Sequence, residues 1–522
     1  MGLYGSETLF FLLFLSLFVL QFLWFRLLSM EGPQTSGENQ DRLVNALFCI
    51  CTALAVSTFF RLYPGNGRAP MEDSSAFLYI GQRMMEGRQP YRDVFDHKGP
   101  LLYLIQVIGL KLTPGSFTGV WLIEVLNMAV TAALLQRLAT LFVKRSGSAY
   151  LAVLAAVGVC GWKIWQGGNF TEEYALPWIS LAAYILFRFF RDEEYTDPQI
   201  VLLGVSFTVV LLLRANMVAV WAALMPIALI LLLVRKRCAE IGKCILLFLL
   251  GIAAVLLPVL IWAHIAGFLE DMWRCYVLFN FRYTDNAAAE GKQLLLLMLA
   301  FAAAIWPGTL AVLVSLFLGS KRRERWFNLI FFLLSLYTVV MSGRLYYHYT
   351  IVLLPTIVLP MGMLFDSMAR LWTGKNPQRE VRPVFLILSF CIMLVGAFAY
   401  RHVSSDEPEY DPLTDYLLDN TDKDDDVLVL GKGQGYYIQT GRKTENRFFY
   451  QLPPLEISQE LRDAFKEELR NHPSDCIVLS GGMEDRDSVK TKLKDVWPVL
   501  EEEIAEHYTT ETYEEFEIYI RQ

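Results

Sequence analysis

The stretch Met71–Pro100, "MEDSSAFLYIGQRMMEGRQPYRDVFDHKGP", joins an amphipathic segment to a dense cluster of charge. Five of its last nine residues are ionisable: Arg92, Asp93, Asp96, His97 and Lys98. An apolar segment, Gly99–Leu112, follows at once. Charge that meets an apolar segment in this way is typical of the boundary between a membrane and water. The function of the cluster therefore depends on the side of the membrane that it faces, which the membrane topology of the chain determines.

The composition is that of a polytopic membrane protein rather than of a large soluble enzyme. Of 522 residues, 54% are hydrophobic and only 19% are charged, and the mean hydropathy is +0.37. The eight cysteines show no spacing that indicates a zinc site or a disulfide framework, so we interpret them as small buried hydrophobic residues. Residues 405–522 hold 13 Lys and Arg against 29 Asp and Glu, whereas the preceding part holds 33 against 24. A basic membrane part thus carries an acidic, soluble tail.

Apolar runs long enough to cross a bilayer predict about twelve transmembrane helices. They fall near residues 8–29, 43–60, 117–142, 149–164, 174–190, 199–213, 217–234, 243–265, 293–318, 326–342, 349–371 and 383–401. The first run follows Glu7 and no basic residue, whereas a cleaved signal peptide would begin with positive charge. We therefore expect a retained helix that enters the membrane from outside.

The basic loops predict the orientation. When the crossings are counted in order, one side of the membrane receives Lys144–Arg145, Arg188 with Arg191, Arg235–Lys243, Lys321–Arg325 and Gly374–Arg382. By the positive-inside rule that side is the cytoplasm, and the protein is expected in the cell membrane. Residues 61–116 and the whole tail are then extracytoplasmic. The short apolar segment Gly99–Leu112 would invert every later loop if it crossed, so we expect it to lie in or dip into the outer surface.

The tail alternates strand and helix patterns. Asp426–Gly431, Asp475–Ser480 and Phe516–Arg521 are predicted strands, and Ile457–His472 is a predicted amphipathic helix. These segments indicate a small α/β domain. The sequence "GKGQG" at Gly431–Gly435 lacks the spacing of a nucleotide-binding loop and lies on the outer side, so it is interpreted as a turn.

Carboxylates on the outer side allow two interpretations. Glu72 and Asp73 begin the amphipathic helix, where an acidic residue can cap free backbone N–H groups or can serve as a catalytic carboxylate at the membrane surface. Glu172 and Glu173 follow two glycines in "WQGGNFTEEYALP" and can be either a helix start or part of a site.

Three cationic or titratable residues accompany these carboxylates. Arg214 lies near the outer end of its crossing, and Arg344 and His348 lie one helical turn apart. An ionisable residue at membrane depth is costly and favours a functional role, although the arginines can also snorkel to the headgroups and the histidine can make a core hydrogen bond. Carboxylates near cations suit transfer from a lipid phosphate, because cations neutralise the phosphate and a carboxylate removes a proton from an incoming hydroxyl.

The quoted loop, continued through "GPLL", resembles the first extracytoplasmic loop of the C-superfamily (GT-C) glycosyltransferases. The relatives are the protein O-mannosyltransferases, which are related to glycosyltransferase family 39, and the aminoarabinose transferases of lipid A. The shared pattern is an early acidic residue, an amphipathic helix rich in Tyr and Phe, and a patch of acidic and basic residues. "GGNFTEEYALP" (residues 167–177), "GRLYYHYTIVLLP" (residues 343–355) and "GRKTENRFFYQLP" (residues 441–453) resemble later elements of the bacterial branch. The similarity covers most of residues 43–522.

The resemblance implies a GT-C transmembrane domain at residues 1–404 with a catalytic loop at residues 61–116. A soluble α/β domain would follow at residues 405–522. Asp73 matches the catalytic acid of the family, which is the presumed general base. Lys98 matches a lysine of the aminoarabinose transferases that contacts the polyprenyl phosphate.

The other candidate residues divide between the two substrates. The expected ligands of the donor phosphate besides Lys98 are Arg214, Arg344 and His348. The expected ligands of the sugar or acceptor are Asp96, His97, Glu172 and Glu173, of which the first two stand where mannosyltransferases have an Asp and a His. Ser74 replaces the second acid of the family motif and "KGP" replaces "KPP" or "HPP", so the acceptor and any divalent metal stay open.

The sequence therefore predicts a membrane glycosyltransferase that takes a sugar from a polyprenyl-phosphate donor and passes it to an envelope glycan, a lipid or a protein. A transporter or flippase of lipid-linked sugars is an alternative, but transporters tend to show internal repeats, and none is visible here. A non-catalytic protein of an envelope complex, with the tail as its binding module, is a second alternative. The concentration of candidate polar groups on one side of the membrane favours the enzyme.

Overall fold

The computed structural model describes residues 38–66, 69–143, 146–282, 291–318, 322–341, 343–373, 383–403, 411–480 and 482–522. The predicted first helix, residues 8–29, lies outside these residues, as do Lys144–Arg145 and residues 374–382. The chain forms two compact units. The first comprises Met1–Gly65, Thr118–Val259 and Ala288–Ser405, and the second comprises Asn66–Phe117, Leu260–Ala287 and Asp406–Gln522. The units therefore interleave along the sequence, and the outer loop belongs with the C-terminal domain.

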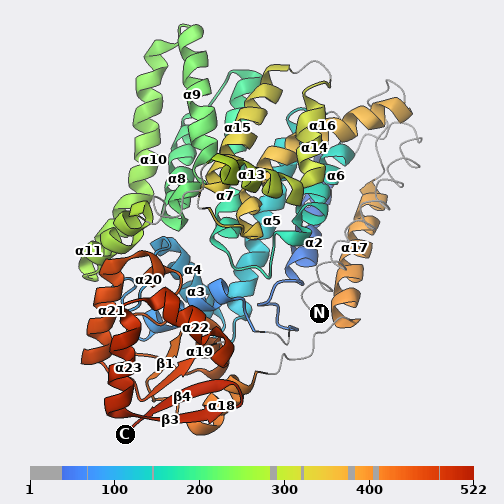
Figure 1. Cartoon of the computed structure of the whole chain (residues 1–522). Helices are drawn as coiled ribbons and strands as arrows, with labels where there is room; N and C mark the ends of the chain where they lie inside the picture. Colours follow the sequence, from blue (N-terminus) through green and yellow to red (C-terminus); the bar gives the residue numbers. More distant parts are fainter. Residues whose placement is uncertain are drawn as a thin grey trace. The chain divides into compact units, whose positions relative to one another are not determined.

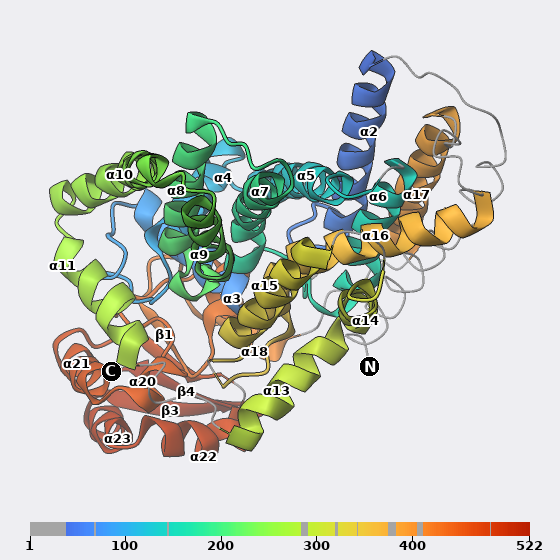
Figure 2. The same ribbon diagram turned by 90° about the horizontal axis from the view of Figure 1, so that it is seen from above.

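The first unit is helical. Its elements are α2 (Glu38–Ser57), α5 (Thr118–Thr140), α6 (Ser146–Leu154), η1 (Ala155–Val159), η2 (Gly161–Lys163), α7 (Thr171–Asp192), α8 (Asp197–Leu213), η3 (Ala215–Met217), α9 (Ala219–Val234), most of α10 (Cys238–Ile265), α13 (Gly291–Ala304), α14 (Trp306–Ser315), α15 (Arg322–Val340), η5 (Tyr347–Leu353), α16 (Leu354–Thr373) and α17 (Pro383–Val403). Segments far apart in the sequence pack together: α17 lies beside α2, and α5 lies beside α7 (Figure 2). Among the described residues, each predicted apolar run is helical over most of its length.

The surface of α10 shows why this unit needs a lipid environment. Leu246 is 68% exposed and Leu250 is 57% exposed, and little of the apolar span is buried. Figure 1 shows α10 along one edge of the helices of this unit. A fully apolar helix surface of this kind is stable in the hydrocarbon of a membrane and would be unfavourable in water.

Small residues allow two of these helices to approach closely. A Cβ atom at Gly204 of α8 would clash with the carbonyl oxygen of Phe248 in α10, and a Cβ atom at Gly251 would clash with the carbonyl oxygen of Val201. Glycine at both positions therefore lets the two backbones touch, which is the usual way in which helices gain packing energy in a bilayer.

The predicted number of crossings is not confirmed. Among the described residues, three helices are long and apolar enough to cross a membrane: Thr118–Thr140, Cys238–Ile265 and Tyr347–Leu371. Shorter apolar helices, including Asp197–Leu213 and Ala219–Val234, fall just below that length. About twelve crossings therefore stays a prediction.

One predicted crossing, residues 293–318, is not a single straight helix. The structure breaks it into α13 and α14, which meet at an angle of 96°. Pro307 accounts for the break at Ile305, because proline lacks the backbone N–H that a continuous helix would donate to the carbonyl four residues earlier, and its ring clashes with that carbonyl. The Thr309 hydroxyl donates to the carbonyl of Ala302 at 2.8 Å and so satisfies one acceptor at the break.

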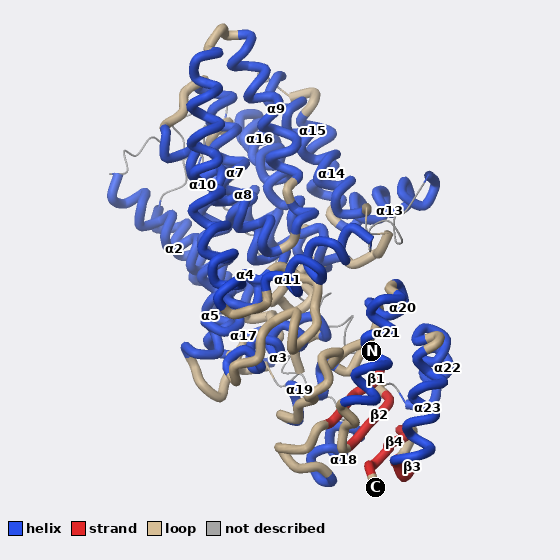
Figure 3. The backbone as a smooth tube through the Cα atoms, turned by 90° about the vertical axis from the view of Figure 1, so that its left-hand side faces the viewer, coloured by secondary structure: helices blue, strands red, loops and turns tan. Residues whose placement is uncertain are grey.

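The second unit combines helices with a small sheet (Figure 3). Its elements are α3 (Glu72–Met85), α4 (Pro100–Leu112), α11 (Leu269–Met272), η4 (Trp273–Leu278), α18 (Pro412–Asn420), β1 (Val427–Leu430), α19 (Gln434–Thr440), α20 (Pro454–Ile457), α21 (Gln459–Asn471), β2 (Cys476–Leu479), α22 (Gly482–Leu493), α23 (Val496–His507), β3 (Tyr508–Tyr513) and β4 (Phe516–Arg521). The strand order is β1-β2-β4-β3. β1 and β2 are parallel, with Val427 opposite Cys476, while β4 is antiparallel to both β2 and β3.

The expected combination of strands and helices in the tail is thus present. The three predicted strands correspond to β1, β2 and β4, and the predicted amphipathic helix corresponds to α21. β1 and β2 are buried along their whole length, which agrees with their continuous apolar sequence. The sequence pattern did not predict β3, because its alternation of Thr, Glu and Tyr lacks an apolar face.

Candidate functional site

The predicted catalytic residue Asp73 lies in the first turn of α3. Met71 occupies the N-cap position of this helix and makes no side-chain capping bond, so Asp73 is not the cap residue. The helix dipole favours a negative charge in this turn. The Asp73 side chain is half-buried, whereas the following residues from Ser74 to Gly81 are buried.

Two neighbours hold α3 in place. α4 approaches closely at Gly81, where a Cβ atom would come within 2.8 Å of the Gln106 Cβ. On the tail side, α19 packs against α3, and the Tyr79 ring lies 4.7 Å from the Tyr437 ring and 4.6 Å from the Phe449 ring. The Tyr79 hydroxyl also accepts from the backbone N–H of Thr444 at 3.0 Å. The C-terminal domain therefore forms part of the wall that positions Asp73.

Lys98 reaches the side of α3 that carries Asp73. Its ammonium nitrogen lies 6.0 Å from the centre of the Phe77 ring, and Phe77 is one helical turn after Asp73. The Lys98 side chain is 15% exposed. The structure thus brings a half-buried acid and a half-buried cation to the same face of one helix.

Asp96 lies at the centre of the charged cluster and is buried. Its carboxylate accepts hydrogen bonds from the Tyr103 hydroxyl at 2.8 Å, the Tyr450 hydroxyl at 2.7 Å and the backbone N–H of His97 at 2.7 Å. The Lys98 nitrogen lies 3.9 Å from the nearer carboxylate oxygen. Burial raises the pKa of Asp96, but the Lys98 and His97 charges and the hydrogen bonds outweigh it and hold the pKa below its usual range. The carboxylate therefore organises the loop around Lys98, and the predicted contact of Asp96 with a sugar or acceptor stays a prediction.

His97 is held by a residue that the sequence did not single out. Its Nδ1 atom lies 3.0 Å from the Asn280 Oδ1 atom, and the Asn280 amide donates to the His97 carbonyl at 2.7 Å. The His97 Nε2 atom lies 3.2 Å from the Lys98 ammonium. A lone asparagine after an apolar run gives no sequence signal of such a role, because its partner is 183 residues away.

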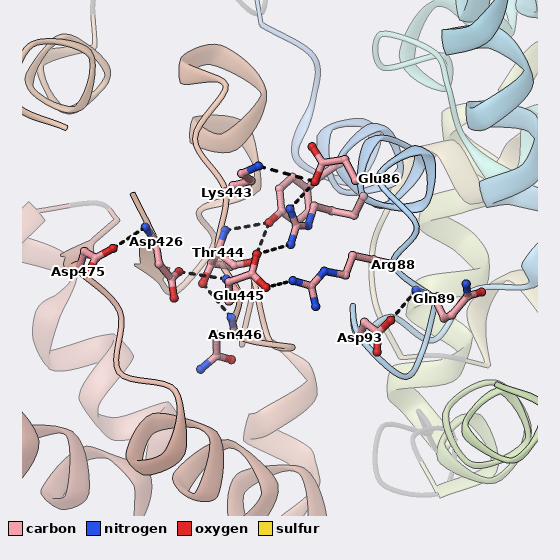
Figure 4. A network of polar contacts seen from close by, with 12 residues as sticks. Glu86, Arg88, Gln89, Asp93, Asp426, Lys443, Thr444, Glu445, Asn446 and Asp475 are labelled. Carbon is pink, nitrogen blue, oxygen red and sulfur yellow. Dashed lines mark hydrogen bonds and ion pairs between the residues drawn. The ribbon is translucent and has the colours of Figure 1, made fainter. Parts of the chain in front are cut away.

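An ion pair between loop and tail completes the surroundings. Arg83 is 4% exposed and donates to Glu445 at 2.8 Å, and Arg88 makes an ion pair with the other Glu445 oxygen. Figure 4 shows Glu445 facing Arg88, on the segment that also carries Lys443 and Thr444. The segment "GRKTENRFFYQLP" thus supplies both Glu445 and Tyr450 to the loop.

The remaining candidate residues form a second cluster, which lies within the first unit. Glu172 is buried and makes an ion pair with Arg214, whose guanidinium lies 4.1 Å from the centre of the Tyr349 ring. His348 is buried, stacks on Phe170 at 4.2 Å and lies 2.9 Å from the Gln166 Oε1 atom. Glu172, Arg214 and His348 are therefore brought together. Arg344 is half-buried in the segment before η5.

Glu173 has a partner that the sequence analysis missed. Asn169 donates its backbone N–H to Glu124 at 2.6 Å and to Glu173 at 3.0 Å, and both glutamates are fully buried. Glu124 lies within α5, so the rule that favours function for an ionisable residue at membrane depth would have found it. The predicted contact of Glu173 with an acceptor stays a prediction. Among the described residues, no three His, Cys, Asp or Glu side chains gather closely enough to hold a metal ion.

A family model described as "Putative competence-induced protein Ccs4 N-terminal domain" matches residues 42–401. The chain belongs to this family. The match covers both the outer loop and most of the helical unit, while the C-terminal domain of this Ccs4-family protein lies beyond it. No curated protein matches the chain.

Two crystal structures of ArnT from Cupriavidus metallidurans are similar in fold to this Ccs4-family protein. The form bound to undecaprenyl phosphate is 11% identical, with 93% of this chain and 98% of that chain covered and a TM-score of 0.53. The apo form is also 11% identical, with 90% and 96% covered and a TM-score of 0.54. The GT-C fold that the sequence predicted is confirmed by this similarity.

Proposed function

We propose that the protein is a membrane glycosyltransferase that moves a sugar from a polyprenyl-phosphate donor to an extracytoplasmic acceptor. The observation that carries the proposal is the placement of Lys98 over Phe77, one helical turn from Asp73. A general base and a phosphate ligand are then available on the same face of α3. The GT-C fold supports the reaction class, and the undecaprenyl phosphate bound to one ArnT structure supports the donor class.

In this proposal Asp73 accepts the proton of the acceptor hydroxyl while the oxygen of that hydroxyl bonds to the anomeric carbon of the sugar. The bond between that carbon and the phosphate oxygen breaks, and the electron pair leaves with the phosphate. Lys98 neutralises the charge that develops there. A single displacement on a β-linked donor would invert the anomeric configuration.

The second cluster takes supporting roles in the proposal. Within the first unit, Glu172 orients Arg214 through their ion pair, and the contacts of Arg214, Arg344 and His348 with a phosphate stay predictions. The contacts of Asp96, His97 and Glu173 with the sugar or acceptor likewise stay predictions. The positive-inside rule puts the loop and the C-terminal domain outside the cytoplasm.

Mass spectrometry of lipid-linked sugars and envelope glycans, with and without the gene, tests this function. Deletion should cause one polyprenyl-phosphate sugar to accumulate, and the wild-type gene should clear it. D73N should fail to clear it at normal protein levels, whereas the neighbouring E72Q should behave as wild type because Glu72 is an exposed residue paired with Lys432. Full complementation by D73N, or unchanged lipid and glycan pools on deletion, would exclude this proposal.

A sugar-transfer assay with purified donor separates donor binding from the chemical step. K98A should raise the apparent KM for the donor by about tenfold to a hundredfold, as expected for loss of one charge-assisted hydrogen bond. K443A removes a partly exposed lysine of the C-terminal domain and should leave the KM unchanged. An unchanged donor KM in K98A would remove Lys98 from the phosphate site.

A further inference from the structure

The carboxylate of Asp96 has more donors than a simple ion pair needs. The Tyr103 hydroxyl binds one oxygen, and the Tyr450 hydroxyl and the His97 backbone N–H bind the other. These neutral donors satisfy the ion in its buried position. The Lys98 ammonium consequently stays 3.9 Å from the carboxylate, beyond normal hydrogen-bond distance.

The position of Lys98 is also restrained from its own backbone. The Tyr91 hydroxyl donates to the Lys98 carbonyl at 2.7 Å, and the Tyr103 oxygen lies 3.3 Å from it. The side chain then extends over Phe77, next to His97 Nε2 at 3.2 Å. An ammonium has three N–H donors, and the Asp96 carboxylate at 3.9 Å is too far away to accept a normal hydrogen bond, so Lys98 retains donor capacity for an incoming anion.

Tyr450 comes from the C-terminal domain and is anchored firmly. The backbone N–H of Phe95 donates to the Arg447 carbonyl at 2.9 Å, and the Phe95 ring lies 5.3 Å from the Phe448 ring. Gln451 donates to the Phe448 carbonyl at 2.7 Å and accepts from the Gly431 backbone N–H at 2.7 Å. The hydroxyl of Tyr450 is therefore a fixed donor that the tail delivers to the loop.

We propose that Tyr450 is a positioning residue that occupies the Asp96 carboxylate and thereby keeps the Lys98 ammonium available for the donor phosphate. The C-terminal domain then sets the phosphate affinity of the loop without touching the substrate. This inference rests on the proposed function. Without the Tyr450 hydroxyl, one Asp96 oxygen loses a donor, and Lys98 closes onto it as the nearest cation.

Amine labelling with mass spectrometry on the full-length protein tests this inference independently of sugar transfer. In Y450F the ring remains and only the hydroxyl is lost, so Lys98 should react at least about threefold more slowly relative to Lys432 in the same molecule. Y103F removes the donor to the other oxygen and should act in the same direction. Y416F is the matched control, because its hydroxyl donates to Glu511 at 3.0 Å instead, and it should leave the labelling ratio unchanged.

Undecaprenyl phosphate serves as the binding probe. It should protect Lys98 of the wild type from labelling, and its apparent Kd should rise about tenfold in Y450F but not in Y416F. If the lipid does not protect Lys98 of the wild type, that result counts against the proposed phosphate site and not against the link between Tyr450 and Lys98. If protection occurs, but Y450F shows the wild-type labelling ratio and Kd, this inference is refuted and the proposed function stands. Equal changes in Y450F and Y416F would likewise refute it in favour of a general structural effect.

Discussion

At the scale of single residues, the buried carboxyl pair Glu124 and Glu173 bears directly on the stability of the helical unit. Both accept from the Asn169 backbone N–H, and the second oxygen of each is buried with no hydrogen-bond partner among the described residues. Two negative charges this close in a buried site would repel each other, and unsatisfied oxygens add a desolvation cost. Two ionised carboxylates are therefore unfavourable here, and the site favours a pair that retains a proton.

Replacement of Glu124 by glutamine should be neutral or stabilising. The amide keeps the size of the side chain, removes a titratable group and can donate to Glu173, so we expect a gain of up to about 1 kcal/mol in the free energy of unfolding. Thermal unfolding of the purified protein in detergent measures it. E124A, which leaves a cavity beside Glu173, is the contrasting variant and should be less stable than E124Q. A clear loss of stability in E124Q would show that the acid pair makes a contact that glutamine cannot replace.

At the scale of elements, the ion pairs of Glu445 join α3 and its following loop to the C-terminal domain. Burial raises the pKa of Glu445, but the hydrogen bond from Arg83 and the charges of Arg83, Arg88 and Lys443 hold it below its usual value of 4.5. The side chain is 43% exposed, so solvent weakens the gain. Arg83 is almost fully buried and would lose a partner if Glu445 were neutral.

E445Q should therefore lower the free energy of unfolding of the second unit by about 1–2 kcal/mol at pH 7. Because the pKa of Glu445 is lower in the folded state, this contribution is present above about pH 4.5 and is lost as the pH falls through the folded-state value. The difference in Tm between wild type and E445Q should thus shrink in acid. E460Q, which breaks an exposed pair with Arg282, should change Tm little at any pH. A difference that grows in acid would contradict the assigned cause.

At the scale of the whole molecule, the second unit is built from three separate segments of the chain. The loop contributes α3 and the charged cluster, and the tail contributes Tyr437, Phe449 and Tyr450 to the same core. Neither segment buries its aromatic residues alone. The loop should consequently depend on a domain that begins about 300 residues later.

A chain that ends at Val403 should retain its apolar helices but lose the fold of the loop. Trypsin added to the outside of spheroplasts should then cut after Arg83 and Arg88, which pair with Glu445 in the complete protein. The full-length protein should resist cleavage at these two sites. Equal protection in both chains would show that the loop folds without the tail, and cleavage only in inside-out vesicles would reverse the predicted orientation.

Local patterns explain how much of this structure was predictable. The apolar runs gave the helices, and continuous apolar runs gave β1 and β2, because hydrophobic patterning acts over a few residues. The break between α13 and α14 could also have been predicted, because the sequence contains Pro307 at that point. Asn280 and Tyr450 could not be assigned in the same way from spacing, because each acts on a partner far away in the chain.

The sequence by itself determined the class of the protein: a helical membrane chain with an acidic α/β tail and a charged loop that carries Asp73 and Lys98. The tertiary structure alone decided that Asp96 organises the loop, that Lys98 lies over Phe77, and that the C-terminal domain completes this region. The physical reason is that composition and periodicity report burial, whereas the partner of a buried charge depends on which distant segments meet. Only the folded chain brings Tyr450 within hydrogen-bond distance of Asp96, 354 residues before it.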